Sequence, residues 1–86
     1  MSPFIPALER IERARKLIQK ARQLPVPAES GKYDLTYIAK VKDILQQARD
    51  LVKFISYTPS ATPEMKNEVK KIFEEADQAE REILHN

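Results

Sequence analysis

The sequence predicts an all-α protein, an up-down-up three-helix bundle. Apolar residues recur at alternating steps of three and four in three separate runs, which places each run on one side of a helix. Two proline-rich segments separate the runs, and each run is long enough for a helix of about 22 residues that spans about 33 Å. Matched lengths and short connections favour antiparallel neighbours. At 86 residues the chain is predicted to be one domain, 1–86, with a thin core.

The first helix is predicted over residues 3–24. Ser2 suits the N-cap position, and a proline, Pro3 or Pro6, suits the first helical position. Pro25 and Pro27 end this helix because proline lacks the amide that a helix needs. The predicted apolar side carries Phe4, Leu8, Ile11, Ala14, Ile18 and Ala21.

The second helix is predicted over residues 34–57, after a loop that holds the single glycine, Gly31. Asp34 is its predicted N-cap, because a short acceptor side chain satisfies free amides of the first turn. The predicted apolar side carries Tyr37, Val41, Ile44, Ala48, Leu51 and Ile55.

The third helix is predicted over residues 63–85. Thr62, Pro63 and Glu64 supply a cap, a proline at the first position and an early acid. The predicted apolar side carries Met65, Val69, Ile72, Ala76, Ala79 and Ile83. Across the three helices the predicted core consists of Leu8, Ile11, Ile18, Ile38, Val41, Leu45, Ala48, Val52, Ile55, Val69, Ile72, Ala76 and Ile83.

Three charged residues fall on the apolar sides of their helices. Arg15 and Arg22 lie close to Ile11 in helical angle, and Glu80 lies between Ile72 and Phe73. In an up-down-up bundle the first and third helices run parallel, so we predict a structural ion pair of Glu80 with Arg15 or Arg22. The alternative is an anion site formed by the two arginines on a concave surface.

One aromatic residue of the second helix falls outside its apolar arc. Phe54 lies on the side of Asp43 and Asp50, and Tyr57 follows one turn later. Either Phe54 packs under the turn at 58–62, or it is an exposed anchor for a partner, because exposed aromatic residues are common at contact sites. The predicted partner-binding residues are Phe54, Tyr57 and Lys53.

Charge is unevenly distributed although the net charge is only +2. Residues 1–24 contain six Lys or Arg against Glu9 and Glu12, whereas residues 63–86 contain seven Asp or Glu against four Lys or Arg. The first helix therefore has a basic face that is a candidate nucleic-acid surface. Its candidate phosphate contacts are Arg10, Arg13, Lys16 and Lys20.

Few residues suited to nucleophilic or metal-assisted catalysis are present. The chain has no cysteine, and its one histidine, His85, lies next to the last residue, so neither a nucleophile–base pair nor a zinc site is expected. One glycine does not make a phosphate loop. We therefore expect no enzymatic activity, no catalytic residue, no metal and no cofactor.

Other features bear on location. The first residues lack a basic region followed by a long apolar run, and no stretch approaches the roughly 20 apolar residues of a membrane span, so we expect neither secretion nor membrane insertion. A cytoplasmic location is expected, because cysteine is absent. The low glycine content and the 33% charged residues resemble the composition of thermophile proteins.

Three functions are consistent with these features. The favoured one is a non-enzymatic protein-interaction module, a small accessory subunit or adaptor of a larger assembly, itself a monomer or weak homodimer. The first alternative is a nucleic-acid-binding accessory protein of a replication or processing complex. The second follows from the layout of the whole chain, which is similar to MIT domains. That resemblance implies a trafficking adaptor that binds a helical tail between its helices.

Overall fold

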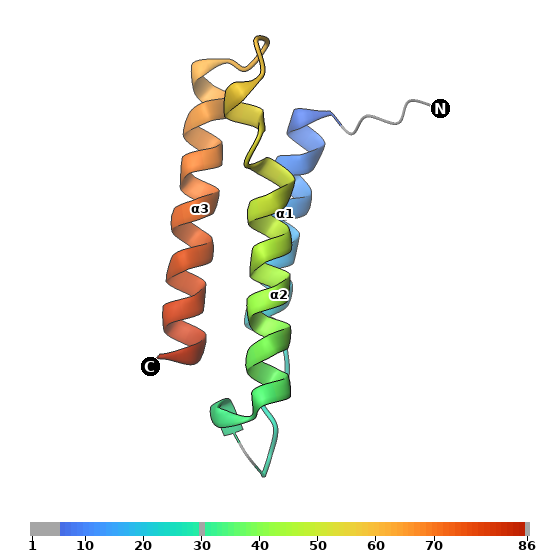
Figure 1. Ribbon diagram of the computed structural model, residues 1–86, viewed down its shortest axis with the longest axis vertical. Coiled ribbons are helices and arrows are strands. Elements are labelled where there is room, and N and C mark those ends of the chain that lie inside the picture. The colour runs from blue at the N-terminus through green and yellow to red at the C-terminus, as the bar shows by residue number, and fades with distance from the viewer. Residues whose placement is uncertain (1–5, 30, 86) are drawn as a thin grey trace, which may run out of the picture.

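The structure, a computed structural model, describes residues 6–29 and 31–85. It contains three packed helices, α1 (Ala7–Gln23), α2 (Leu35–Val52) and α3 (Pro63–Leu84). Two 3₁₀ turns, η1 (Gly31–Tyr33) and η2 (Ile55–Tyr57), flank α2, and no strand occurs in the described ranges. The helices run up, down and up, so α1 and α3 are parallel and α2 is antiparallel to both (Figure 1). The predicted fold class is confirmed.

The start of α1 differs from the prediction. The helix begins at Ala7, and Pro6 precedes it, with the Pro6 carbonyl accepting a hydrogen bond from the Arg10 amide at 3.0 Å. The predicted cap Ser2, together with Pro3 and Phe4, lies outside the described residues. The helix ends at Gln23 because Leu24 precedes Pro25 and is extended, with ψ of 133°.

The loop between α1 and α2 turns at Gly31, whose φ is +59°. This left-handed conformation suits glycine because it has no β-carbon. The Gly31 amide donates to the Pro27 carbonyl at 2.9 Å, which closes the turn. Asp34 then caps α2 as predicted, and its carboxylate accepts from the Tyr37 amide at 2.9 Å.

The last turn of the second helix is tighter than predicted. The α-helical part ends at Val52, and η2 follows after one turn. Thr58 precedes Pro59 and is extended with ψ of 140°, so the chain leaves the helix there. The Ile55 carbonyl accepts from both the amide and the hydroxyl of Thr58, at 3.1 and 2.7 Å. These bonds satisfy carbonyl groups that a helix end leaves unpaired.

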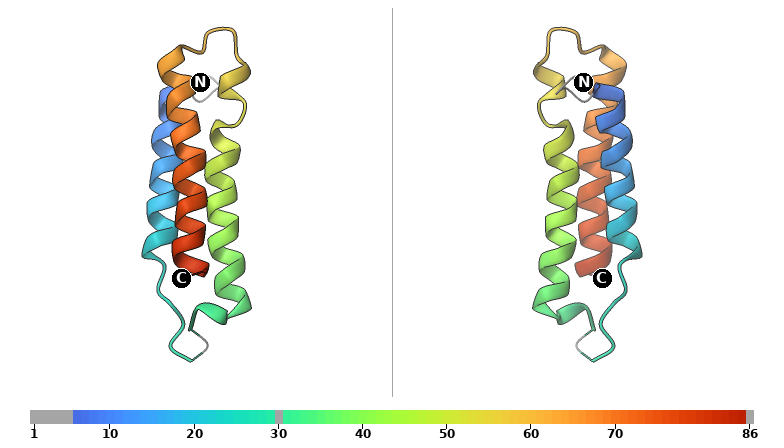
Figure 2. Two further views of the ribbon diagram at one scale, coloured as in Figure 1. Left: turned by 90° about the vertical axis from the view of Figure 1, so that its left-hand side faces the viewer. Right: turned by 90° about the vertical axis from the view of Figure 1, so that its right-hand side faces the viewer.

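The start of α3 agrees with the prediction. The Thr62 hydroxyl accepts from the Met65 amide at 3.1 Å, Pro63 is the first helical residue, and Glu64 lies in the first turn. The helix then continues through 22 residues to Leu84. In Figure 2, α3 lies over the seam between α1 and α2, so the three helices form a triangle in cross-section.

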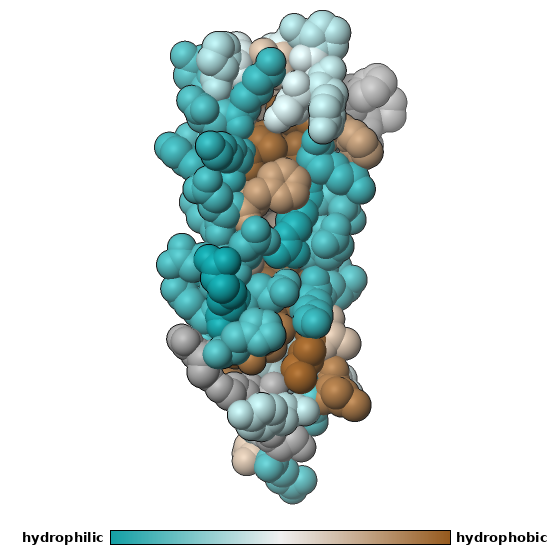
Figure 3. Space-filling model, turned by 60° about the vertical axis from the view of Figure 1, so that its left-hand side comes forward, coloured by the Kyte–Doolittle hydropathy of each residue, from teal (hydrophilic) through white to brown (hydrophobic). Residues whose placement is uncertain are grey.

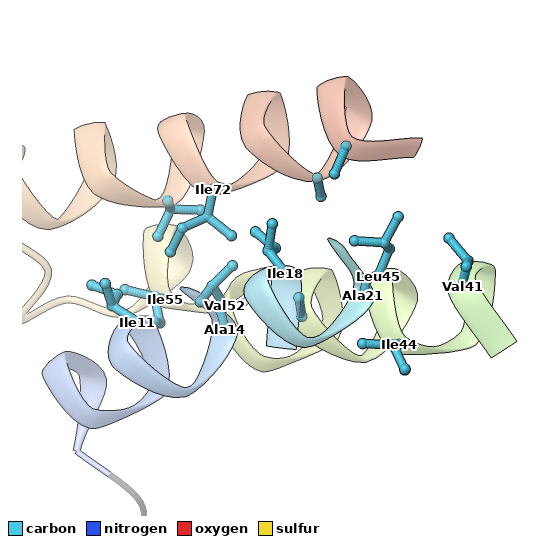
Figure 4. Close-up of a cluster of buried hydrophobic side chains, with 14 of the residues drawn as sticks. Ile11, Ala14, Ile18, Ala21, Val41, Ile44, Leu45, Val52, Ile55 and Ile72 are labelled. Carbon is cyan, nitrogen blue, oxygen red and sulfur yellow. The ribbon is translucent and has the colours of Figure 1, made fainter. Parts of the chain in front are cut away.

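The core is formed by apolar side chains from all three helices and η2 (Figure 4). Leu45, Ile72, Val41 and Val52 are its largest fully enclosed side chains, and no charged or polar residue of the described ranges is buried. The buried residues are Ile11, Ala14, Ile18, Ala21, Tyr37, Val41, Ile44, Leu45, Ala48, Val52, Ile55, Val69, Ile72, Ala76 and Ala79.

Three predicted core residues are not buried. Leu8 is 63% exposed, because it precedes Arg15 and Arg22 by seven and fourteen residues and therefore shares their edge of α1. Ile38 and Ile83 are half-buried, and they lie in the first turn of α2 and the last turn of α3. The assignment of Leu8 to the core is therefore wrong, and that of Ile38 and Ile83 is correct only in part.

Candidate partner-binding site

The seam between α1 and α3 is bordered by ion pairs. Arg15 pairs with Glu68 and Arg22 pairs with Glu82. The hydrogen bond from Arg15 is the main cause that lowers the pKa of Glu68 below its ordinary value, and that from Arg22 does the same for Glu82. These pairs join the basic half of α1 to the acidic helix that runs parallel to it. The alternative of an anion site is not supported, because both arginines already hold carboxylates.

The seam between α2 and α3 is bordered by a third arginine. The Arg49 guanidinium lies 2.8 Å from Asp77 and 3.5 Å from Glu80, and only 15% of its side chain is exposed. The predicted pairing of Glu80 with Arg15 or Arg22 is therefore wrong. Glu80 follows Asp77 by three residues, so both acids lie on the flank of α3 that faces α2. Figure 3 shows apolar surface between the polar borders of this side of the molecule.

The seam between α1 and α2 differs from the other two, since no ion pair crosses it within the described ranges. Half-buried Leu17 and Leu51 form its floor and line two adjoining hollows of about 340 and 320 Å³. We call this surface the α1–α2 groove, and it is defined by Arg13, Lys16, Leu17, Lys20, Gln47, Asp50 and Leu51.

The α2 wall of the groove has its polar groups paired within the helix. Asp50 accepts a hydrogen bond from Gln46 at 2.9 Å and pairs with Lys53 at 3.1 Å. The hydrogen bond from Gln46 is the main cause that lowers the pKa of Asp50, and Lys53 adds to it. Gln47 donates to Asp43 at 2.8 Å. This wall therefore carries little unpaired charge.

Phe54 continues the groove side of α2 beyond Leu51. It follows Leu51 by three residues, and residues 53 and 54 keep helical backbone angles. Phe54 is 61% exposed and Tyr57 is 82% exposed, so the turn at 58–62 does not cover Phe54, and that alternative is wrong. The Lys53 ammonium lies 5.1 Å from the centre of the Phe54 ring, within the range of a cation–π contact.

Residues of two predicted sets lie along the α1–α2 groove or within one helical turn of it. Three of the four predicted phosphate contacts, Arg13, Lys16 and Lys20, form the α1 wall of the α1–α2 groove. Of the predicted partner-binding residues, Lys53 pairs with Asp50 of the α2 wall, Phe54 lies one helical turn beyond Leu51 of the floor, and Tyr57 lies in η2. Arg10 lies one turn before Arg13 on the same helix and is half-buried. Because α1 and α2 are antiparallel, the path from Lys20 to Arg13 runs toward Phe54.

Two residues of these seams, Leu17 and Arg49, were not identified from the sequence. Leu17 was not assigned to the apolar side, although it lies between Arg13 and Lys20 at steps of four and three. Arg49 was not assigned to a seam, although it lies three residues before fully buried Val52. Both residues lie at an edge of their helix's apolar arc, and that spacing was the available signal.

The described residues lack two signs of a buried polar site. They contain no group of three or more His, Cys, Asp or Glu placed to hold a metal, and no buried side-chain nitrogen or oxygen without a hydrogen-bond partner. His85 is exposed and follows the last residue of α3. Within these ranges no helix has the length and apolar character that crossing a bilayer requires.

Comparison with protein-family models, curated proteins and solved structures finds no match to this chain. The resemblance to MIT domains therefore depends on the arrangement of three helices alone. Any functional assignment must come from the surface of the molecule, where the α1–α2 groove and the aromatic end of α2 adjoin.

Proposed function

We propose that this protein is a non-enzymatic protein-interaction module, an accessory subunit or adaptor, that docks through the end of α2. The observation that carries the proposal is the 61% exposure of Phe54 beside Tyr57, which is 82% exposed. Both follow a helix whose preceding turns are anchored by fully buried Ala48 and Val52. An aromatic side chain held on such a support loses little conformational entropy when a partner covers it.

The exposed apolar area of Phe54 is large enough for this residue to anchor a partner protein. An aromatic side chain has about 150–250 Å² to bury. With 61% of Phe54 exposed, roughly 90–150 Å² of it is available to a partner, which at about 25 cal/mol per Å² corresponds to about 2–4 kcal/mol before the cost of association. A residue of this kind is a typical hot spot.

The test is a quantitative comparison of what the protein and its variants capture from the native extract. Phe54→Ser and Tyr57→Ser remove the aromatic surface, and we expect each to lose the same partner that the unsubstituted protein retains. Leu35→Ser is the matched control, because Leu35 is 81% exposed at the opposite end of α2. Circular dichroism checks that each variant keeps its helical content.

A partner set that is identical for the unsubstituted protein, the control and Phe54→Ser would contradict the proposal. Loss of the folded state is not expected to explain a lost partner in this experiment. Substitutions at exposed positions usually change the free energy of unfolding by less than about 0.5 kcal/mol.

Binding of a nucleic acid is the second candidate, and one observation favours it. Arg13, Lys16 and Lys20 line the same hollow, so three cations are presented together. A mobility-shift assay with DNA and RNA over a range of salt concentrations tests this candidate, because phosphate contacts give a steep salt dependence. Against this candidate, the residues that line the two hollows include no aromatic side chain on which a base could stack.

The adaptor form of the proposal includes the MIT-like alternative. Only the three-helix arrangement supports it. Its distinguishing expectation is a partner segment that is helical when bound and lies between two helices of the bundle.

A further inference from the structure

We propose that the α1–α2 groove binds an acidic amphipathic helix of a partner protein, with its apolar side on Leu17, Leu51 and Phe54 and its carboxylates against the α1 wall. This inference rests on the proposed function and adds the location and chemistry of the partner segment. Four features of the structure support it: the seam without a bridging ion pair among the described residues, the different charges of the two walls, the apolar floor and the helical build of the bundle.

The α1–α2 groove is the seam that has no bridging ion pair within residues 6–29 and 31–85. Arg15 and Arg22 bind acids across one of the other seams, and Arg49 binds acids across the second. No such pair crosses the α1–α2 groove within the part of the chain that the structure describes. A partner can therefore reach the leucines of the groove floor without breaking an ion pair between helices.

The walls of the groove differ in charge, and this difference selects an acidic partner. Lys16 and Lys20 are exposed and form no hydrogen bond or ion pair within the described residues. Arg13 pairs with Glu9 at 3.0 Å, and both side chains are about half exposed. A carboxylate of the partner can replace Glu9 at little cost in free energy, because exposed ion pairs are weak. Across the groove, Asp50 already has Gln46 and Lys53 as partners. The unpaired charge of the groove is therefore positive.

The bundle selects a helical occupant over an extended one. Its described elements are helices and 3₁₀ turns, so they present no sheet edge to which a strand could add. A segment that lies on leucines must satisfy its own backbone amides and carbonyls, and a helix does so internally. From Gln47 to Phe54 the chain advances seven residues, about 10 Å, which matches two turns of a helix with apolar anchors at spacings of three, four and seven.

The binding test uses two synthetic 18-residue helical peptides, which at about 27 Å extend beyond the groove at both ends. They share one leucine stripe and carry either Glu or Lys on its flanks. Binding is followed by fluorescence anisotropy and by the chemical shifts of the methyl groups of Leu17 and Leu51 and the ring of Phe54. We expect the Glu peptide to bind, to shift these signals and to weaken as salt is added. We expect the Lys peptide to bind at least about tenfold more weakly.

Charge reversal supplies the matched variants. The double variant Lys16→Glu and Lys20→Glu is expected to weaken binding of the Glu peptide about tenfold or more, because it reverses two charges at the rim. The control is Lys66→Glu with Lys70→Glu, which makes the same change in net charge at the same spacing of four on the exposed side of α3. The control is expected to bind as the unsubstituted protein does.

Several results would overturn the inference. These are equal binding of the two peptides, shifts confined to other surfaces, or equal effects of the two double variants. Tighter binding of a DNA or RNA oligonucleotide at the same signals would assign the groove to nucleic acid. Concentration-dependent dimerisation that shifts the same signals would assign it to a second copy.

The two proposals fail separately. If Phe54→Ser loses a native partner while the Glu peptide does not bind the groove, the interaction module stands and the acidic helix does not. If Phe54→Ser captures every partner protein that Leu35→Ser captures, the proposed function itself fails.

Discussion

Arginines at the edges of the apolar arcs determine which helices are joined by charge. Arg15 and Arg22 reach α3 from α1, and Arg49 reaches it from α2. Their aliphatic stems lie beside the core while their guanidinium groups stay at the rim, which is the usual position of a long cationic side chain. The three arginines therefore fix the rotation of α3 more than they add to stability.

A double-mutant cycle tests the assignment of Glu80. Alanine substitutions at Arg49 and Glu80 are expected to show a coupling energy of about 0.5–1 kcal/mol in urea unfolding, because the two groups share a partly buried ion pair. The same cycle for Arg15 and Glu80 serves as the control and is expected to give a coupling near zero. Coupling in the second cycle and not in the first would restore the pairing that the sequence suggested.

Ile72 is one of the four largest fully buried side chains of the core. It is fully buried, so Ile72→Ala is expected to lower the free energy of unfolding by about 2–5 kcal/mol, through lost transfer energy and the cavity left behind. Leu8→Ala is the matched control and is expected to cost less than about 1 kcal/mol, since Leu8 is 63% exposed. Urea denaturation measures both. A loss below about 1 kcal/mol at Ile72 would mean that the buried face of α3 is wrongly assigned.

At the scale of the element, prolines and caps define the helices, and these were readable from the sequence. Asp34 and Thr62 cap α2 and α3 as predicted, because each precedes its helix with an acceptor that reaches a free amide. The end of the second helix was less predictable. Its last turn becomes 3₁₀ because Thr58 must be extended before Pro59, and this effect depends on backbone geometry beyond periodicity.

The cap of α3 has a measurable contribution. Thr62→Ala removes the hydroxyl that accepts from Met65 and is expected to lower the free energy of unfolding by about 0.5–2 kcal/mol. Ser60→Ala, in the exposed part of the same turn, is the control and is expected to be nearly neutral. Equal effects in thermal unfolding would show that the hydroxyl of Thr62 does not act as a cap.

For the whole molecule, the handedness of the bundle decides which edge of each helix faces which neighbour. The sequence placed Glu80 on the apolar side of α3, between Ile72 and Phe73 in helical angle, but periodicity does not say whether that part of the helix faces α1 or α2. The two hands of a three-helix bundle bury the same residues, so the core was largely predictable while the ion-pair partners were not. The same limit applied to the site. The basic residues of α1 were identified without a partner surface, and only the packing of α1 on α2 places them beside Leu51, one helical turn before Phe54.

Acid is expected to loosen α3 from α1. Glu68 and Glu82 have pKa values lowered by Arg15 and Arg22, so they contribute stability above the ordinary glutamate pKa of 4.5 and lose it as the pH falls through their lower values. The free energy of unfolding, measured in urea between pH 6 and pH 3, is expected to fall below pH 4.5. Glu68→Gln with Glu82→Gln is expected to flatten that fall.

The matched control for the acid experiment is Glu12→Gln with Glu74→Gln. These two glutamates are exposed and form no ion pair within the described residues. The control is expected to retain the full dependence on pH. If the double variant Glu68→Gln and Glu82→Gln shows the same pH dependence of the free energy of unfolding as the unsubstituted protein, the α1–α3 ion pairs do not contribute to stability.

The odd number of helices has a practical consequence for attaching the molecule to a surface. The start of α1 lies at the same end of the bundle as η2, whereas α3 finishes at the other end (Figure 1). Phe54 directly precedes η2. The long axis measures 48 Å. A linker at the C-terminal side therefore holds the aromatic end away from a sensor chip or resin, while an affinity tag at the N-terminal side stands close to it. Immobilisation from the two sides should thus give different apparent affinities for a partner that covers Phe54.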